Sequence, residues 1–422
     1  MRFLFLLSQD VESSASAGRY FPIAKELAQR GHDIVILGLH PNFRLLSKRV
    51  MSTGRIKIWY VAPMHVIKTK TRKIYYPFYL QILVIVRATL ALVLATLRSP
   101  ADLIYVCKPH PMNGLAGFIA SRVKGIPLIV DCDDYEAQNN RFHNSLEQWV
   151  VKKFEKWLLA KAHYITVHTL VLRAHFVSEG LDPDRIIYLP HGIDTSRFNA
   201  DNLSPEEIVS LQDALNLAGK KVIAYIGSFS RVTHALDILL EAFEKVRAEL
   251  PDAILLLVGR GEDYDWVKQQ IRHRGIEQFV RVCEWVPPDR VFLYYKLAHV
   301  AVDPVYDNVA ARCSLSLKIF DSWACNIPLI TTDVGDRRRI LGEPPAGLVV
   351  PPNDSNALGA GILTVLKDQT YAALLAERGQ QRVEIFRWAR LIEIVEEISC
   401  RAVRKAMKWK KGSQNCELPK EL

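Results

Sequence analysis

Short apolar runs, separated by helical patterns, recur along the first half of the chain. Between them, helices are expected over residues 24–30, 115–124 and 145–161, the first two ending at glycines 31 and 125. Such alternation is typical of a parallel sheet covered on both faces, so the first half is predicted to be a doubly wound α/β domain. Seven runs are the predicted strands: RFLFLLS (2–8), DIVILGL (33–39), RIKIWYVA (55–62), ADLIYVC (101–107), IPLIVD (126–131), HYITVH (163–168) and RIIYLP (185–190).

The same pattern restarts after a helix that is expected near Ser204-Pro205-Glu206. Beyond Asn353 the chain is expected to be helical to about Lys411, with a loose tail over 413–422. This predicts three parts: a first α/β domain over 1–195, a second α/β domain over 196–388, and a C-terminal helix with a basic tail over 389–422. Six runs are its predicted strands: KVIAYIGS (221–228), AILLLVG (253–259), FVRVCEW (279–285), HVAVDPV (299–305), IPLITTD (327–333) and GLVVP (347–351).

One apolar segment, residues 78–97 (FYLQILVIVRATLALVLATL), is long enough to span a membrane. The strands predicted on either side of it, 55–62 and 101–106, are expected in one sheet, and a span would place them on opposite sides of a bilayer. We therefore predict a largely buried or interfacial helix. The apolar start of the chain stops at Ser8-Gln9-Asp10, too soon for a secretion signal, and is predicted to be a buried strand.

Composition and charge narrow the classes of protein to which the chain can belong. Hydrophobic residues make up 49% and charged residues 24%, as in packed soluble proteins, which excludes a wholly disordered chain. Residues 1–195 carry 25 Lys and Arg against 15 Asp and Glu, whereas residues 196–400 carry 23 against 28. This split suits an anionic surface or substrate near the first half, although solubility alone is the favoured explanation when charge is considered by itself. Seven cysteines without a CxxC pair indicate reduced thiols in the cytoplasm rather than a zinc module.

Several motifs occur in one order along the chain: YLPHGIDTSRF (188–198), YIGSF (225–229), LDILLEAF (236–243), LLLVGRGED (255–263) and KIFDSWACNIPLITTDVG (318–335). They resemble glycosyltransferase family 4, and AGRYFPIAKELAQRGHDIVIL (17–37) and FRW (386–388) extend the resemblance over nearly the whole chain. The resemblance implies the GT-B fold, two Rossmann-like doubly wound domains facing across a cleft. It also implies retaining transfer of a sugar from a nucleotide-diphosphate sugar to an acceptor hydroxyl, in envelope glycan or glycolipid synthesis, without a metal or other cofactor.

The donor site is expected at Ser316-Leu317-Lys318, which opens a helix. Free N–H groups and the positive end of the helix dipole suit a diphosphate, and Lys318 adds a charge. The resemblance implies that Asp321, one turn later, holds the ribose hydroxyls. The alternative is that Ser316 is only a helix cap and Asp321 a solvated surface group.

The motif departs from the family at three positions. Cys313 stands where many members have Glu, Gly227 is followed by Ser228 in place of a basic residue, and His234 occupies the usual Lys position. Arg231, Arg312 and a protonated His234 are candidates for the missing diphosphate charge. These departures also fit a non-catalytic partner subunit, and a nucleotide-sugar epimerase is a third hypothesis.

Two further donor-side residues follow from the resemblance. Gly259, in Gly259-Arg260-Gly261, would bring backbone near the base or sugar, although such turns are common. Trp285 lies where the family packs its nucleobase, and a core tryptophan is the alternative.

On the acceptor side, Gly18, His110, Asp133 and Asp134 follow predicted strands, at the edge where parallel sheets bind ligands. The family often has a His or Asp in these loops near the reacting sugar, so the resemblance makes His110, Asp133 and Asp134 the candidate catalytic residues. For any single one of them, a structural role is the favoured explanation. Asp131-Cys132-Asp133 matches the Asp-x-Asp metal motif of another glycosyltransferase fold. Such matches are frequent by chance, and this one lies in the acceptor half, so no metal site is predicted.

Residues 66–80 (VIKTKTRKIYYPFYL) combine four basic and four aromatic side chains. Such a strip suits peripheral contact with an anionic membrane, here at the inner membrane face, and a solvated loop over core aromatics is the alternative. The basic helix over 401–411 would extend the same surface. No nucleic-acid module surrounds the strip, so the expected partners are the nucleotide-sugar donor and a glycan or lipid-linked acceptor, without nucleic acid.

Overall fold

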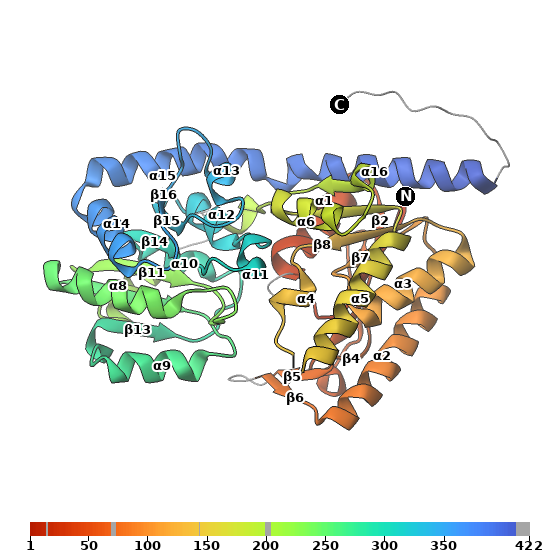
Figure 1. Cartoon of the computed structure of the whole chain (residues 1–422), viewed down its shortest axis with the longest axis horizontal. Coiled ribbons are helices and arrows are strands. Elements are labelled where there is room, and N and C mark those ends of the chain that lie inside the picture. Colours follow the sequence, from red (N-terminus) through yellow and green to blue (C-terminus); the bar gives the residue numbers. More distant parts are fainter. Residues whose placement is uncertain (14–15, 69–72, 143, 199–203, 411–422) are drawn as a thin grey trace.

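The computed structural model describes residues 1–13, 16–68, 73–142, 144–198 and 204–410. Two α/β halves lie side by side, each built on its own sheet (Figure 1). In both sheets the strands follow the predicted runs, which confirms the doubly wound α/β class. The tail predicted over 413–422 lies outside the described residues.

The first sheet has eight strands in the order β10-β9-β8-β7-β1-β2-β4-β3. Every neighbouring pair is parallel except β3 and β4, which are antiparallel. All seven predicted strands are present, whereas β3 was not predicted, because its residues are exposed and lack apolar alternation. The strands are β1 (Arg2–Leu7), β2 (Asp33–His40), β3 (Val50–Thr53), β4 (Ile56–Pro63), β7 (Leu103–Cys107), β8 (Leu128–Cys132), β9 (Tyr164–Val167) and β10 (Ile186–Tyr188).

Helices cover both faces of this sheet, and a short hairpin precedes the longest of them (Figure 1). The hairpin joins β5 (Val66–Lys68) and β6 (Lys73–Tyr75). A π-helical turn, Ser16–Tyr20, links β1 to the first helix. The helices are α1 (Phe21–Gln29), α2 (Phe78–Arg98), α3 (Pro111–Lys124), α4 (Glu136–Asn139), α5 (Ser145–Lys161) and α6 (Leu170–Ser178).

The helix α2 corresponds to the apolar segment. The strands before and after it, β4 and β7, belong to the same sheet, as predicted. However, only 22% of its most apolar window is buried. The prediction of a largely buried helix is therefore wrong, and the interfacial interpretation remains.

The second sheet has six strands, all parallel, in the order β13-β12-β11-β14-β15-β16. All six predicted strands are present. They are β11 (Lys221–Ile226), β12 (Ala253–Val258), β13 (Val280–Cys283), β14 (Val300–Asp303), β15 (Leu329–Thr332) and β16 (Leu348–Val350).

The helix expected near residue 204 is α7, and the Ser204 side chain caps it by accepting a hydrogen bond from the Glu207 N–H at 3.1 Å. The helices of this half are α7 (Pro205–Ala214), α8 (Leu236–Glu249), α9 (Tyr264–His273), α10 (Val291–Lys296), α11 (Val309–Arg312), α12 (Leu317–Ala324), α13 (Arg337–Leu341), α14 (Ser355–Lys367) and α15 (Gln369–Val383).

The last helix, α16 (Trp388–Lys410), returns to the first half (Figure 1). Trp388 is 1% exposed, and its Nε1 donates to the Gly18 carbonyl at 3.2 Å. Leu391, Ile392 and Val395 join one hydrophobic cluster with strands β1, β2 and β4. By packing, α16 therefore completes the core of the first domain.

Candidate functional site

Acidic side chains gather around Lys108 at the carboxyl ends of β7 and β8. Lys108 Nζ lies 2.9 Å from Asp133 Oδ1, 2.9 Å from Asp134 Oδ2 and 3.0 Å from Glu136 Oε1. Lys108 has a φ of 66°, a left-handed conformation that is unusual for a residue with a side chain. We call Lys108, His110, Asp133, Asp134 and Glu136 the acidic cluster.

His110 belongs to this cluster through both ring nitrogens. Its Nδ1 lies 2.6 Å from Ser8 Oγ, at the end of β1, and its Nε2 lies 2.8 Å from Glu136 Oε2. The structure thus brings together the three predicted catalytic residues, His110, Asp133 and Asp134. It adds Lys108, Glu136 and Ser8, which sequence reasoning missed because their side chains meet only in the folded chain.

Burial sets the electrostatics of the cluster. Desolvation raises the pKa of Asp133 to about 7, although Lys108 acts in the opposite direction. Burial would also raise the pKa of Glu136, but Lys108 and His110 lower it below its ordinary value. At neutral pH the cluster therefore holds one carboxyl group near its titration point, beside a carboxylate that stays ionised.

The Asp-x-Asp residues do not act together. Asp131 forms a fully buried ion pair with Arg19, with Nε–Oδ1 and Nη2–Oδ2 distances of 2.8 Å. The carboxylates whose ligand atoms lie within 4.8 Å of one another are instead those of Asp133, Asp134 and Glu136. The Lys108 ammonium already lies within ion-pair distance of all three.

The predicted donor residues meet at the carboxyl ends of β11 and β14 and at the start of α12. Ser316 caps α12, and its Oγ accepts from Lys318 Nζ at 3.0 Å. Lys318 is buried and pairs with Asp303 Oδ1 at 3.2 Å. Burial lowers the pKa of Lys318, while Asp303 opposes this shift. Asp303 was missed by sequence reasoning, although it lies within a predicted strand, and it ends β14 in the structure.

Two glycines let neighbouring loops approach this point closely. A Cβ on Gly227 would lie 2.5 Å from Lys318 Cε, and one on Gly259 would lie 2.0 Å from the Gly227 carbonyl oxygen. Gly259 also has a φ of 139°, which L side chains rarely adopt. A side chain at Gly259 would therefore clash with backbone, whereas one at Gly227 would displace the Lys318 side chain.

His234 and Arg231 lie beside this group, but neither offers a free positive charge. Burial lowers the pKa of His234 well below its ordinary value, so the ring is neutral at pH 7. Arg231 Nε lies 3.3 Å from Asp263 Oδ1, and its guanidinium lies 4.4 Å from the centre of the Trp266 ring. The hypothesis of a protonated His234 thus has no support in the structure.

The other donor candidates lie farther out. Arg312 is exposed and forms two hydrogen bonds with Asp307, at 2.5 and 2.8 Å. Trp285 is 51% exposed, so the alternative of a core tryptophan is wrong. Burial raises the pKa of Asp321 on α12 to about 6, and the charge of Arg197 opposes that shift.

Hydrogen bonds between the two domains join the two sets of residues. Ser314 Oγ donates to Asp134 Oδ1 at 2.9 Å, and the Leu315 N–H donates to His168 Nε2 at 3.0 Å. Thr169 Oγ1 donates to the Cys313 carbonyl at 3.1 Å, and Cys313 packs with the core of the first domain.

Gly18 makes a further close contact between the domains. A Cβ on Gly18 would lie 2.4 Å from Leu317 Cδ1, so the turn after β1 fits against the start of α12 only because it carries no side chain. The acceptor-side and donor-side candidates are therefore direct neighbours.

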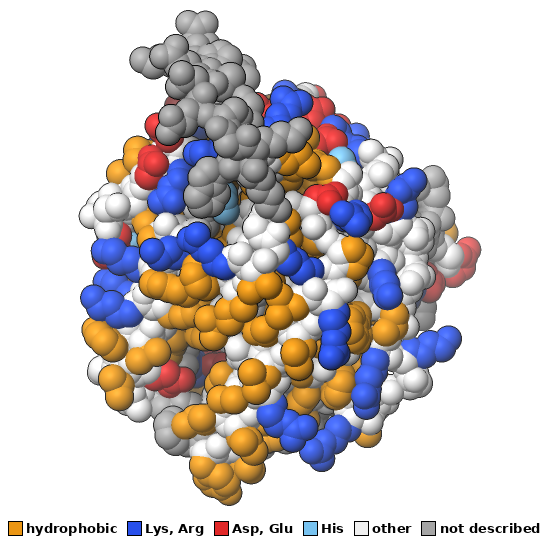
Figure 2. All heavy atoms as spheres, turned by 90° about the vertical axis from the view of Figure 1, so that its right-hand side faces the viewer, with side chains coloured by type: hydrophobic (Ala, Val, Ile, Leu, Met, Phe, Trp, Pro, Cys, Tyr) orange, Lys and Arg blue, Asp and Glu red, His pale blue; other side chains and the backbone are white. Residues whose placement is uncertain are grey.

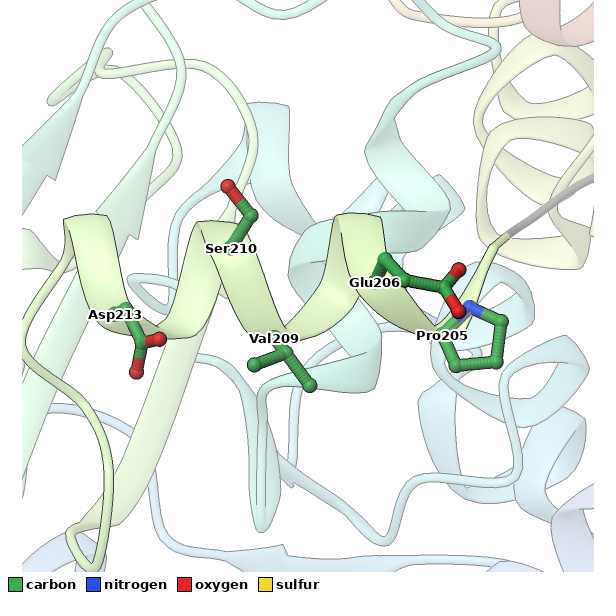
Figure 3. Close-up of a pocket in the computed structure, with 5 residues that line it drawn as sticks. All are labelled: Pro205, Glu206, Val209, Ser210 and Asp213. Carbon is green, nitrogen blue, oxygen red and sulfur yellow. The ribbon is translucent and has the colours of Figure 1, made fainter.

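A separate hollow lies along α7, away from these residues (Figure 3). Its lining side chains, Pro205, Glu206, Val209, Ser210 and Asp213, come from one face of that single helix. It contains none of the predicted site residues, and it opens on exposed surface rather than between the domains.

Two Rossmann-like domains that meet at the carboxyl ends of parallel strands define the GT-B class. Solved structures with this architecture superpose on nearly the whole chain. Sucrose-phosphate synthase from Thermosynechococcus elongatus covers 96% of this chain and 100% of its own, with a TM-score of 0.74 and 17% identity. HepE of Anabaena, in complex with UDP-glucose, covers 95% and 100%, with a TM-score of 0.73 and 19% identity. These similarities confirm the predicted GT-B fold.

Two descriptions of protein families match the sequence of this chain. "Glycosyltransferase Family 4" matches residues 21–197, and "Glycosyl transferases group 1" matches residues 220–368. The chain belongs to glycosyltransferase family 4.

Among its relatives is a phosphatidyl-myo-inositol mannosyltransferase of Mycolicibacterium smegmatis, 23% identical over 60% of this chain and 61% of the relative. Another is the O-antigen chain mannosyltransferase B of Escherichia coli, 27% identical over 44% of this chain and 47% of the relative. The match thus spans about half to three fifths of the length of these relatives.

Proposed function

We propose that the protein transfers a sugar from a nucleotide-diphosphate sugar to the hydroxyl of a glycan or lipid-linked acceptor. One observation carries the proposal: the Ser314 hydroxyl, two residues before the cap of α12, donates to Asp134 of the acidic cluster. A donor held at the start of α12 would lie beside an acceptor held at the cluster, as transfer requires. The names of the relatives, mannosyltransferases of lipid and polysaccharide acceptors, support glycan or glycolipid synthesis.

In the donor half, the N-terminus of α12 would bind the diphosphate and Asp321 the ribose. Asp303 holds the Lys318 ammonium beside Ser316, so its charge would add to the field of the helix. Arg231 and Arg312 would exchange their carboxylate partners for phosphate oxygens. The glycines at 227 and 259 would let backbone approach the ligand, and the exposed Trp285 is proposed to contact the base.

We propose a retaining mechanism in which the departing diphosphate helps to deprotonate the acceptor hydroxyl on the same face of the sugar. The protein's part is to stabilise the leaving group and to align both substrates. His110, Asp133 and Asp134 would orient the acceptor near Gly18. We propose that no metal takes part, because Lys108 already supplies a cation to the acidic cluster.

Calorimetry with a panel of nucleoside diphosphates tests the donor site. We expect one nucleotide to bind with micromolar affinity, unchanged by EDTA, and Asp321→Ala to weaken it at least about tenfold. Asp213→Ala, an exposed carboxylate on α7, is the matched control. Absence of binding by the folded protein would refute the Asp321 assignment and favour a non-catalytic subunit. Loss of binding in EDTA would refute the metal-free proposal.

We also propose that the protein works in the cytoplasm, in peripheral contact with the inner membrane face. Transfer to a lipid-linked acceptor would require such contact. The surface that would provide it is argued next.

A further inference from the structure

The helix α2 presents an apolar face to solvent. Tyr79, Leu83, Val86, Leu90 and Leu94 are 71%, 55%, 49%, 57% and 51% exposed and recur every three or four residues, on one side of the helix. We call these five residues the α2 outer face. The opposite side, with Ala88, Leu92 and Ala95, is buried in the core of the first domain. A contiguous exposed apolar stripe of this length marks an interaction site.

The segment of the sequence that contains this face carries charge of one sign. From residue 34 to residue 101 the chain contains eleven Lys and Arg and no Asp or Glu. On α2 itself Arg87 and Arg98 are exposed and eleven residues apart, so both lie on one flank of the outer face. This stretch holds a positive charge comparable to the +10 of the whole molecule.

A basic pocket adjoins the C-terminal end of α2. Lys124, at the end of α3, bonds to the Ser99 carbonyl just after α2, and Arg122 of α3 lines a pocket of about 310 Å³. None of the described residues that line this pocket is acidic. The lining residues are Arg122, Ala160, Lys161, Ala162, His163, Tyr164, Arg185, Ala402 and Lys405.

Three of the four cations of the pocket have no carboxylate partner among the described residues. Within the described part of the chain, Lys161, Arg122 and Lys405 form no ion pair, and only Arg185 approaches one, Asp182, at 3.6 Å. Positive charges of Arg122, Lys405 and Arg185 lower the pKa of His163, after burial, which has the larger effect. The pocket is thus suited to an anionic group such as phosphate.

Figure 2 looks onto this side of the molecule. Apolar side chains form broad orange patches over its middle and lower parts, with Lys and Arg beside and among them. Acidic side chains lie mainly near the top of the view. The face therefore combines apolar area with an excess of positive charge.

We propose that the α2 outer face and the basic pocket form one docking surface for an anionic lipid bilayer. The helix would lie in the plane of the interface with its outer face among the acyl chains, while Arg87 and Arg98 reach the headgroups. The pocket would hold the phosphate of a lipid headgroup. A bilayer fits better than a second copy of the chain, because two such faces would bring like charges together. A span is excluded because β4 and β7 share one sheet.

Flotation of the full chain with vesicles tests the proposal without any donor or acceptor, so its outcome is independent of the proposed transfer. We expect binding to phosphatidylcholine vesicles that contain phosphatidylglycerol, and little binding to pure phosphatidylcholine. The double variant Leu83→Ser/Leu90→Ser should weaken binding at least about tenfold. Arg122→Ser/Lys405→Ser should weaken it by about tenfold to thirtyfold and make it less sensitive to salt.

Matched controls lie on the second domain: Val209→Ser/Leu374→Ser for exposed apolar residues and Arg272→Ser for an exposed cation. Thermal melts confirm folding, and nucleoside diphosphate binding should be unchanged in every variant. Equal binding to both vesicle types, or unchanged binding by both double variants, would overturn the proposal. So would a dimer that dissociates in Leu83→Ser/Leu90→Ser, because the face would then be a subunit interface.

Competition with inorganic phosphate distinguishes a lipid headgroup from a soluble anion as the ligand of the pocket. If the pocket serves a lipid phosphate, millimolar inorganic phosphate should reduce vesicle binding no more than sodium chloride of equal ionic strength. A specific loss caused by inorganic phosphate alone would assign the pocket to a soluble anion and overturn its part in docking.

Discussion

Arg19 and Asp131 are fully buried yet remain an ion pair, because two short hydrogen bonds join them and neighbours satisfy their remaining atoms. Tyr105 Oη and Thr166 Oγ1 donate to Asp131 Oδ2 at 2.9 and 2.6 Å, and Arg19 donates to the backbone carbonyls of Leu189 and Pro190. Burial would raise the pKa of Asp131, but Arg19 lowers it below its ordinary value. The pair fixes the turn after β1 to β8 and to the chain that leaves β10.

Asp131→Asn should therefore destabilise the fold strongly. It leaves the Arg19 charge buried without its counter-ion, which costs about 3–5 kcal/mol in free energy of unfolding. Asp102→Asn is the control, because its partner Arg2 is 51% exposed and such surface pairs contribute about 1 kcal/mol or less. Urea unfolding of both variants measures the difference. Equal costs would contradict this account.

Glu155 gives stability a predictable dependence on pH. Burial and the charge of Glu136 raise its pKa from 4.5 to about 8. The folded state therefore binds this proton more tightly than the unfolded state does. The resulting contribution of Glu155 to the free energy of unfolding is complete below pH 4.5 and is lost as pH rises toward 8. Glu155→Gln imitates the protonated form. As pH rises over that range, the free energy of unfolding of Glu155→Gln should increase by about 2–5 kcal/mol relative to that of the wild type.

Chemical denaturation at several pH values between 4.5 and 9 checks this expectation. Glu277→Gln, at an exposed position, should show no such trend. A constant difference between Glu155→Gln and the wild type would mean that Glu155 titrates at its ordinary pKa.

The site shows how far sequence reasoning reaches at this scale. His110, Asp133 and Asp134 could be predicted, because each follows a strand at the edge where α/β sheets bind ligands. Glu136 and Ser8 could not, since nothing in the local pattern shows that they bond to His110. His234 was proposed as a charge and is neutral, because burial is not visible in a loop sequence.

At the scale of elements, the turn after β1 packs against the start of α12 through a close contact between Gly18 and the Leu317 side chain. Gly18→Ala would place a Cβ against Leu317, and such overpacking costs about 1–3 kcal/mol. We expect this variant to be destabilised and less active, and Leu317→Ala to restore both properties in the double variant. A double-mutant cycle on unfolding and on transfer rate measures the coupling. Additive effects would show that the two residues do not meet.

Strand prediction succeeded where a strand is rich in apolar residues and failed where it is short and lacks such a run. The thirteen predicted strands are of the first kind, most clearly AILLLV in β12, which is buried at every position. By contrast, β3 (VMST) and the short hairpin of β5 and β6 carry no such pattern and were missed. The helix α2 was predicted, but its exposure was not, because an apolar helix has the same sequence pattern in a protein core and at a membrane surface.

At the scale of the whole molecule, His168 joins the two domains through a neutral ring. Its Nε2 accepts from the Leu315 N–H at 3.0 Å, and burial lowers its pKa from 6.5 to about 4. The folded state therefore binds the proton less tightly than the unfolded state. The contribution of neutral His168 to the free energy of unfolding is therefore complete above pH 6.5. It is lost as pH falls toward 4, and the total loss is about 3 kcal/mol.

Acid should accordingly loosen the contact between the domains. We expect small-angle scattering to show an increase in the radius of gyration between pH 6.5 and 4.5, and His168→Gln, which keeps an acceptor without titrating, to reduce it. His273→Gln, on the exposed surface of α9, is the control. A radius of gyration that depends on pH equally in all three proteins would contradict this role of His168.

The return of α16 has a consequence for how the protein is made. Strands β1 and β2 leave the ribosome well before residues 388–403, some of which belong to the same hydrophobic cluster. The second domain has a continuous sequence between them and can fold while the first is still unfinished. A nascent chain that stops before α16 should therefore carry an uncovered apolar sheet face, and a chaperone that binds such surfaces would protect it until α16 has been synthesised.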